Sequence, residues 1–228
     1  MTDLIAEVWK ELNSIKVSRL EYPAVTSFDE GTFRFIGAVI RVTAAKHVAE
    51  FGGGYAALLA ARELEKTDGV LWLFESDGAA LEKIKSEINL SAEHCRVVPS
   101  QMRRTCKFFG TRLLHAYSSV SPCDMPSGID VAVICREQKD KKRIEGMLRD
   151  IFGFLSERGV IIIAGTGGDE QLRRGIERTV GGSGEVVWLD GFGHGMAVIE
   201  KKKDKLPRPG LLEDIGATFR SLFSLIRK

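Results

Sequence analysis

The sequence has no apolar run close to the roughly 20 residues that a membrane-spanning helix needs. Its N-terminus carries Asp3 and Glu7 where a secretory signal would be apolar. Cysteine is scarce, and no two cysteines form a CxxC pair, so the sequence predicts neither a zinc site nor a disulfide framework. The four cysteines are Cys95, Cys106, Cys123 and Cys135. We therefore expect a reducing, cytoplasmic location.

The sequence also lacks a large excess of either positive or negative charge. The chain of 228 residues has 33 Lys and Arg against 31 Asp and Glu, a net charge of +2. Residues 201–228 contribute +5, from eight basic and three acidic residues, which leaves −3 for the first 200 residues. Nucleic-acid binding requires a basic face, so this near-neutral body predicts no nucleic-acid partner. The length suits one globular domain with appendages.

The most informative stretch runs from Lys46 to Asp77. An apolar run there ends in Glu50, and three glycines and an alanine- and leucine-rich segment follow. This pattern predicts a strand, a tight turn and a helix that begins at about Tyr55. Glycines allow positive φ and close approach of a ligand, and the helix directs free N–H groups into the same space. The glycines are Gly52, Gly53 and Gly54.

A second apolar run, from Val70 to Phe74, predicts the next strand, and Glu75 stands at its carboxyl end. In nucleotide-binding βαβ units a carboxylate at this position accepts hydrogen bonds from a ribose diol. The glycine turn and Glu75 together predict a site for a cofactor that contains a nucleoside.

Two cofactor classes fit such a unit. Gly52-x-Gly54-x-x-Ala57, with Glu75 about 20 residues further on, satisfies the relaxed dinucleotide fingerprint of NAD-dependent oxidoreductases. Glu50-x-Gly52-x-Gly54 resembles instead the first motif of S-adenosylmethionine-dependent methyltransferases. The carboxylate of Glu50 favours the second class, because it suits the ammonium group of the methionine part and would repel a pyrophosphate.

Apolar runs of strand length alternate with helical patterns along the rest of the chain. This alternation predicts an α/β, doubly wound, mostly parallel sheet of seven strands. Only six residues, 190–195, separate the last two strands, so these must pair as an antiparallel hairpin. The expected strands are 46–50, 70–75, 96–99, 129–135, 160–164, 185–189 and 196–200. The expected helices are 2–16, one opened by a capping box at Ser27 and Glu30, one from about 55, and 79–90, 102–117, 141–158 and 169–180.

Three stretches carry a resemblance to the class I S-adenosylmethionine-dependent methyltransferases, a Rossmann-like fold, and within them to the small catechol-type O-methyltransferases. They are GTFRFIGAVIRVTAAK, EFGGGYAALLAA and GFGHGMAVIEKK. The resemblance implies methyl transfer from S-adenosylmethionine to a small-molecule acceptor. The cofactor-binding residues that it implies are Glu50, Gly52, Gly53, Gly54, Tyr55, Glu75, Ser76, Ser100, Gln101 and Cys135.

The chain departs from that family where the family holds its divalent metal. The family's aspartate after the fourth strand and its Asp-Asn pair after the fifth correspond to Cys135, Gly165 and Thr166. These residues offer no carboxylate for magnesium or calcium, so no metal site is expected. Glu137 or Asp169 nearby could substitute.

No catalytic residue is identified. The weak candidates are Arg136, Glu137 and His194, near the carboxyl ends of the predicted strands. The missing metal ligands motivate a second hypothesis, a non-catalytic protein that binds the cofactor or interacts with a partner. NAD-dependent redox chemistry is a third.

The expected organisation is a helical cap (1–45), a methyltransferase-like domain (46–203), and a basic linker with a C-terminal amphipathic helix (204–228). The apolar face of that helix consists of Leu212, Ile215, Phe219, Leu222, Phe223 and Ile226. We expect this face to dock on its own domain or on a second copy. An interfacial membrane helix or a hook for an accessory protein is the alternative.

Overall fold

The computed structural model describes residues 3–17, 29–52, 56–75, 77–91, 95–109, 112–119, 126–134, 144–192, 194–203 and 206. For residues 90–91, 99–109 and 112–119 it describes the backbone alone. The predicted C-terminal helix lies outside these ranges. Over the described part of the chain, no helix has both the length and the apolar character needed to cross a bilayer.

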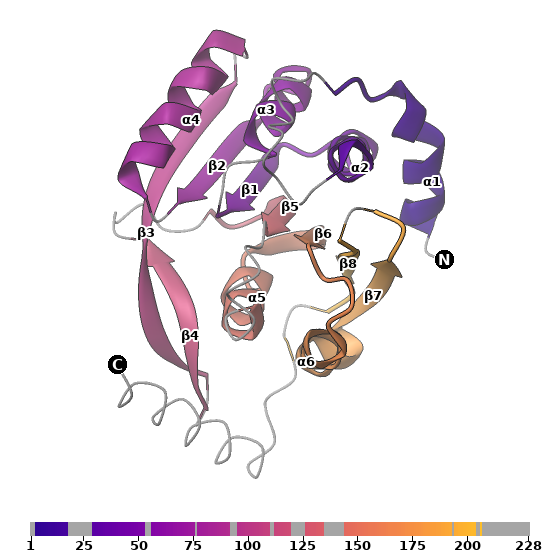
Figure 1. Ribbon diagram of the computed structural model, residues 1–228, viewed down its shortest axis with the longest axis vertical. Coiled ribbons are helices and arrows are strands. Elements are labelled where there is room, and N and C mark those ends of the chain that lie inside the picture. Colours follow the sequence, from indigo (N-terminus) through magenta and orange to yellow (C-terminus); the bar gives the residue numbers. More distant parts are fainter. Residues whose placement is uncertain are drawn as a thin grey trace.

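A twisted sheet forms the centre of the molecule (Figure 1). Its described strands are β1 (His47–Phe51), β2 (Val70–Glu75), β3 (Arg96–Phe109), β4 (Arg112–Ser119), β5 (Ile129–Ile134), β6 (Leu155–Ala164), β7 (Gly184–Leu189) and β8 (Met196–Lys201). They lie in the order β4-β3-β2-β1-β5-β6-β8-β7. Strands β1, β2, β3, β5 and β6 are parallel, and β8 pairs antiparallel with both β6 and β7. The predicted seven-stranded α/β sheet with its terminal hairpin is confirmed, and β4 is added to it.

Helices cover both faces of the sheet (Figure 1). One face carries α1 (Asp3–Glu11), the 3₁₀ turn η1 (Leu12–Ser14), α2 (Glu30–Val42), α3 (Ala57–Glu65) and α4 (Gly78–Ser91), which share one hydrophobic cluster. The other face carries α5 (Ile144–Phe152) and α6 (Glu170–Val180), which share a second cluster. A second 3₁₀ turn, η2 (Gly181–Ser183), follows α6. The arrangement is doubly wound, as expected.

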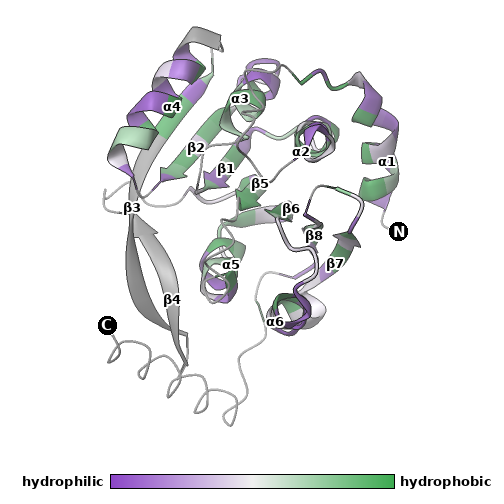
Figure 2. Cartoon of the chain, viewed as in Figure 1, coloured by the Kyte–Doolittle hydropathy of each residue, from purple (hydrophilic) through white to green (hydrophobic). Residues whose placement is uncertain are grey.

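Each central strand contributes side chains to both hydrophobic clusters, because its side chains alternate between the two faces of the sheet. Val131 and Val133 of β5 belong to the α1–α4 side, whereas Ala132 and Ile134 belong to the α5–α6 side. Successive strand residues point to opposite faces, so a strand covered on both faces must be apolar at every position. Figure 2 shows these central strands as hydrophobic. Full burial of a valine or isoleucine side chain stabilises the fold by about 1.5–3 kcal/mol.

The helix predicted over 102–117 is wrong. Strand β3 continues to Phe109, and β4 returns antiparallel to it from Arg112. Phe109 and Arg112 are separated by the two residues Gly-Thr, a length and a first residue that suit a two-residue hairpin turn. The apolar residues of this stretch recur at spacings that suit a helix face as well as two short strands.

Two helix boundaries also differ from the prediction. Helix α5 ends at Phe152, and residues 155–158, expected to be helical, already belong to β6. Ile129 pairs with Leu155 there, so pairing between strands prevails over the local helical pattern. At the start of α2 the N-cap is Asp29, whose carboxylate accepts from the backbone N of Thr32 at 2.7 Å. The expected cap Ser27 lies outside the described residues.

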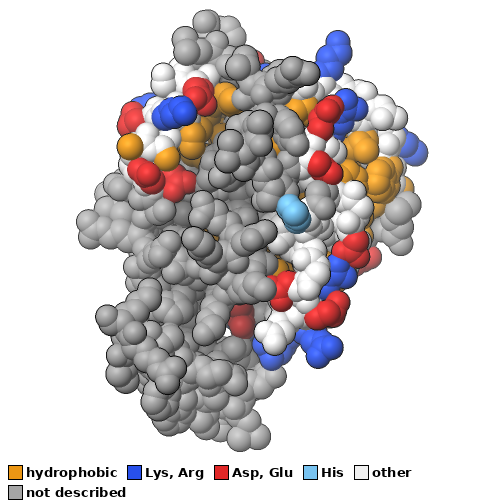
Figure 3. Space-filling view, viewed as in Figure 1, with side chains coloured by type: hydrophobic (Ala, Val, Ile, Leu, Met, Phe, Trp, Pro, Cys, Tyr) orange, Lys and Arg blue, Asp and Glu red, His pale blue; other side chains and the backbone are white. Residues whose placement is uncertain are grey.

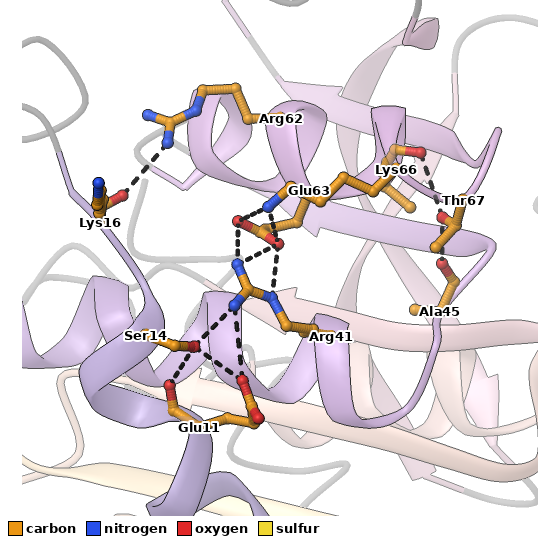
Figure 4. A network of polar contacts seen from close by, with 10 residues as sticks. Glu11, Ser14, Lys16, Arg41, Ala45, Arg62, Glu63, Lys66 and Thr67 are labelled. Carbon is orange, nitrogen blue, oxygen red and sulfur yellow. Dashed lines mark hydrogen bonds and ion pairs between the residues drawn. The ribbon is translucent and has the colours of Figure 1, made fainter.

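An ionic network fastens the N-terminal helices to α3 (Figure 4). The guanidinium of Arg41 binds both carboxylate oxygens of Glu63 at 3.0–3.1 Å. The same guanidinium lies 2.7 Å from the hydroxyl of Ser14 and 3.5 Å from the carboxylate of Glu11. Lys66 also binds Glu63, at 2.7 Å. The network therefore joins α1 and η1 to α2 and α3.

Candidate functional site

The parallel strands end together at one edge of the sheet. Phe51, the last residue of β1, pairs with Phe74 of β2 and with Ile134 of β5. From β1 the chain proceeds outward through β2 and β3, and it later builds β5 and β6 on the opposite side. Such a reversal point opens the crevice in which doubly wound folds bind ligands, beyond the carboxyl ends of the strands.

Glu50 lies at this reversal point, inside the protein. It is the penultimate residue of β1, and its side chain is buried with an exposure of 1%. Its Oε1 atom accepts a hydrogen bond from the backbone N of Ala56, the N-cap residue of α3, at 3.1 Å. A carboxylate at the N-terminal end of a helix is stabilised by the helix dipole. Glu50 therefore links the end of β1 to the start of α3 from inside the protein.

Gly52 begins the turn with φ 79°, a conformation that favours glycine. Its backbone N donates to the carbonyl of Phe74 at 2.9 Å, which extends the contact between β1 and β2 by one residue. The rings of Phe51 and Phe74 stack with centroids 4.7 Å apart and an interplanar angle of 3°. The hydrogen bond and the stacked rings therefore fix Gly52 as the residue at which the chain leaves the sheet.

Glu75 ends β2 beside this turn and is 7% exposed. Its Oε1 atom accepts from the backbone N of Asp77 at 3.0 Å, and Asp77 in turn accepts from the N of Ala79 at 2.8 Å at the start of α4. Two buried carboxylates, Glu50 and Glu75, thus lie at adjacent strand ends. Two further cofactor-binding residues that the resemblance implies follow on β3, where Ser100 pairs with Phe74 and Gln101 pairs with Glu75 in the backbone register.

The other expected site residues lie outside the described parts of the chain. They are Gly53, Gly54, Tyr55, Ser76, Cys135, Arg136 and Glu137.

His194, a catalytic candidate, is exposed in the turn between β7 and β8, and Figure 3 shows a histidine at the molecular surface on the face drawn. The structure holds this turn against the loop after β6. The backbone N atoms of Gly165 and Thr166 both donate to the carbonyl of Gly195, at 2.9 and 3.0 Å, and that of Gly167 donates to the carbonyl of His194. A Cβ atom at Gly167 would lie 2.3 Å from that carbonyl oxygen, so only glycine fits. The sequence analysis did not predict this contact, although the closely spaced glycines of the loop after β6 indicate that two backbone segments can approach each other there.

Aromatic residues fix the same turn from the opposite side. The ring of Phe192 lies 5.4 Å from those of Phe35 on α2 and Trp9 on α1. Trp9 remains 40% exposed. Such pairs contribute about 0.5–1.5 kcal/mol each beyond their buried area. The N-terminal helices therefore reach the edge of the sheet where β6 ends.

The described residues at the family's metal positions do not fit a divalent cation. Gly165 and Thr166 supply no carboxylate, and the carboxylate of Asp169 accepts from the backbone N of Leu172 at 3.1 Å as the N-cap of α6. Within the described ranges no group of three His, Cys, Asp or Glu residues could hold a metal ion. Magnesium and calcium require several oxygen ligands, and this loop does not offer them.

Cys95 is remote from this edge, directly before β3. Burial, and secondarily the nearby carboxylate of Glu65, raise the pKa of its thiol from 9.0 to about 11. A thiol with so high a pKa stays protonated and unreactive at neutral pH. Cys95 therefore has a packing role.

No protein-family model matches this sequence, and no curated protein matches it. Solved structures do resemble the chain. A methyltransferase from Geobacter sulfurreducens has a TM-score of 0.55 at 12% identity, over 89% of this chain and 91% of its own. An SAH-bound methyltransferase from Podospora anserina gives 0.55 at 14%, over 89% of each chain.

An O-methyltransferase from Bacillus cereus, in complex with SAH, gives a TM-score of 0.50 at 14% identity, over 88% of this chain and 92% of its own. Identities this low show a common fold and nothing finer. The chain has the fold of the class I methyltransferases.

Proposed function

We propose that this protein transfers a methyl group from S-adenosylmethionine to a small molecule without a catalytic metal. The observation that carries the proposal is the buried carboxylate of Glu50 at the glycine turn, hydrogen-bonded to the N-terminal end of α3. Glu75 on the next strand has the position for the ribose hydroxyls. Two solved structures of the same fold contain SAH, which supports this choice of cofactor.

The charge of Glu50 separates this proposal from NAD chemistry. A pyrophosphate about 4 Å from the carboxylate would be repelled by about 4 kcal/mol per unit charge at an effective dielectric constant of 20. The ammonium group of the methionine part would be attracted by a similar amount. The same carboxylate therefore favours one cofactor and disfavours the other.

Methyl transfer is an in-line displacement at the sulfonium methyl carbon. The bond from the methyl carbon to sulfur breaks as the bond to the acceptor atom forms, and the neutral thioether leaves. The protein's contribution is mainly to position the two reactants, with a base where the acceptor carries a proton. His194 is the one weak catalytic candidate within the described residues. Metal independence is proposed because Gly165 and Thr166 stand at the family's metal positions.

The test is calorimetric titration of the protein with S-adenosylmethionine, S-adenosylhomocysteine and NAD. We expect the first two to bind and Glu75→Ala to weaken both, because the ribose hydroxyls lose their acceptor. Glu87→Ala, an exposed carboxylate on α4, is the matched control and should change neither affinity. Binding of NAD alone would refute the proposal.

Methyl transfer itself is then tested with a panel of small acceptors, by release of S-adenosylhomocysteine with and without EDTA. Equal rates in both conditions are expected, and loss of activity in EDTA would refute metal independence. Cofactor binding with no transfer to any acceptor would favour the non-catalytic hypothesis.

A further inference from the structure

The loop after β6 holds a buried hydroxyl group that the fold does not use. Thr166 is the second residue after β6, and its side chain has an exposure of 0%. Its Oγ1 atom has no hydrogen-bond partner among the described residues. Buried polar side-chain atoms in folded proteins normally have a partner, because an unpaired buried hydroxyl costs free energy. The hydroxyl of Thr166 therefore has a role other than stability.

The backbone that carries this hydroxyl is held in place. Three consecutive N–H groups, from Gly165 to Gly167, donate to carbonyls of the turn between β7 and β8. Strand β8 follows this turn and pairs antiparallel with β6. The hydroxyl is thus attached to a fixed part of the sheet edge, as a group that orients a ligand must be. Because the fold has already removed it from water, a ligand group that bonds it meets no competing water at that atom.

Thr166 lies at the same edge of the sheet as the proposed cofactor site, two strands away. In the sheet order β5 separates β6 from β1, whose penultimate residue is Glu50. Adjacent strands are about 4.8 Å apart, so the ends of β1 and β6 lie about 10 Å from each other. The crevice of a doubly wound fold opens between them, where the strand order reverses. The end of β6 therefore suits a second small molecule beside the cofactor.

The charges near Thr166 indicate the chemical class of that molecule. Residues 165–168 are uncharged, and the next residue is Asp169, whose carboxylate caps α6. An anionic ligand group would be repelled by this carboxylate, and the described residues 165–169 offer it no cation. Burial of an unpaired ion is very costly. A neutral hydroxyl or carbonyl group suits the threonine hydroxyl, which both donates and accepts.

We propose that the Thr166 hydroxyl hydrogen-bonds a neutral polar group of the methyl acceptor and orients the acceptor beside the cofactor. This inference rests on the proposed function, because it concerns the second substrate of that reaction. Thr166 itself exchanges neither a proton nor the methyl group.

The first test is thermal unfolding of the ligand-free protein and needs no acceptor. Thr166→Val keeps the shape of the side chain and removes an unpartnered hydroxyl, so Tm should stay within about 1 °C of the wild type or rise. A fall of several degrees would show that the hydroxyl is bonded within the protein or to a buried water. That result would overturn the proposal whatever the acceptor is.

The second test is steady-state kinetics with phenol, catechol and benzyl alcohol as neutral acceptors and benzoate as an anionic one. Thr166→Val should raise KM for a neutral acceptor about tenfold, because its bonded group is then buried without a partner. The value of kcat should stay within about threefold, since the lost contact is made in the ground state as well. Thr166→Ser keeps the hydroxyl and should restore KM. Calorimetry should give the same affinity for S-adenosylmethionine in both variants.

Thr179 provides the matched control. Its side chain is also 0% exposed, and its hydroxyl also has no partner among the described residues. It lies nine residues after the start of α6, about 14 Å along the helix from the loop that holds Thr166. Thr179→Val should therefore leave KM and cofactor affinity unchanged.

The outcomes separate this inference from the proposed function. Methyl transfer with an unchanged KM in Thr166→Val, or with an equal rise in Thr179→Val, would overturn the inference alone. Preferential transfer to benzoate would overturn the neutral class of acceptor. Absence of transfer by the wild type to any acceptor would refute the proposed function, and the inference with it.

Discussion

The ionic network around Glu63 gives the most quantitative prediction, made for Glu63→Ala. The side chain of Glu63 is 2% exposed, and that of its partner Arg41 is 32% exposed. Breaking a fully buried ion pair costs about 3–5 kcal/mol. In the Glu63→Ala variant, Arg41 would still contact solvent, the Ser14 hydroxyl and the carboxylate of Glu11. We therefore expect a smaller cost, a decrease of about 2–3 kcal/mol in the free energy of unfolding.

Thermal unfolding measures this loss. In a domain of this size each kcal/mol shifts Tm by about 2–4 °C, so Glu63→Ala should lower Tm by about 4–12 °C. Adding Arg41→Ala to it should cost less than the sum of the two single losses, because the guanidinium and carboxylate share one interaction. The exposed pair of Glu30 and Arg34, with side chains 54% and 37% exposed, is the control.

Glu30→Ala should cost no more than about 0.5 kcal/mol, since exposed i,i+4 pairs are weak. A similar small effect at both positions would refute the argument that burial makes the Glu63 interaction strong. Additivity of Glu63→Ala and Arg41→Ala would show that the two residues stabilise the fold separately.

Three single residues, Gly167, Cys95 and Thr179, give the further predictions. Gly167→Ala should lower Tm by several degrees and increase hydrogen exchange at Gly195, because the new Cβ would meet the carbonyl of His194 at 2.3 Å. Cys95 should resist thiol reagents at neutral pH until the protein unfolds. Its raised pKa also means that its contribution to stability, present below pH 9, is lost as the pH rises from 9.0 to about 11, which denaturation at several pH values measures. Thr179→Val should raise Tm slightly, because the Thr179 hydroxyl is buried on α6 without a hydrogen-bond partner.

The central strands, and the positions of Glu50 and Glu75 at strand ends, could be predicted because their signals are local. Continuous apolar runs identify strands buried on both faces, and Glu50 and Glu75 directly continue such runs. The contact of Gly167 with His194 could not be predicted in the same way. It joins residues 27 positions apart, and only the pairing of β6 with β8 brings them together.

The antiparallel pair of β3 and β4 was not predicted from the sequence, for a different reason. Phe108, Phe109, Leu113, Leu114 and Tyr117 recur at spacings that suit a helix face. They also suit two short strands separated by the dipeptide Gly-Thr. Local spacing cannot decide between these readings, whereas the eight cross-strand pairs of β3 and β4 do so.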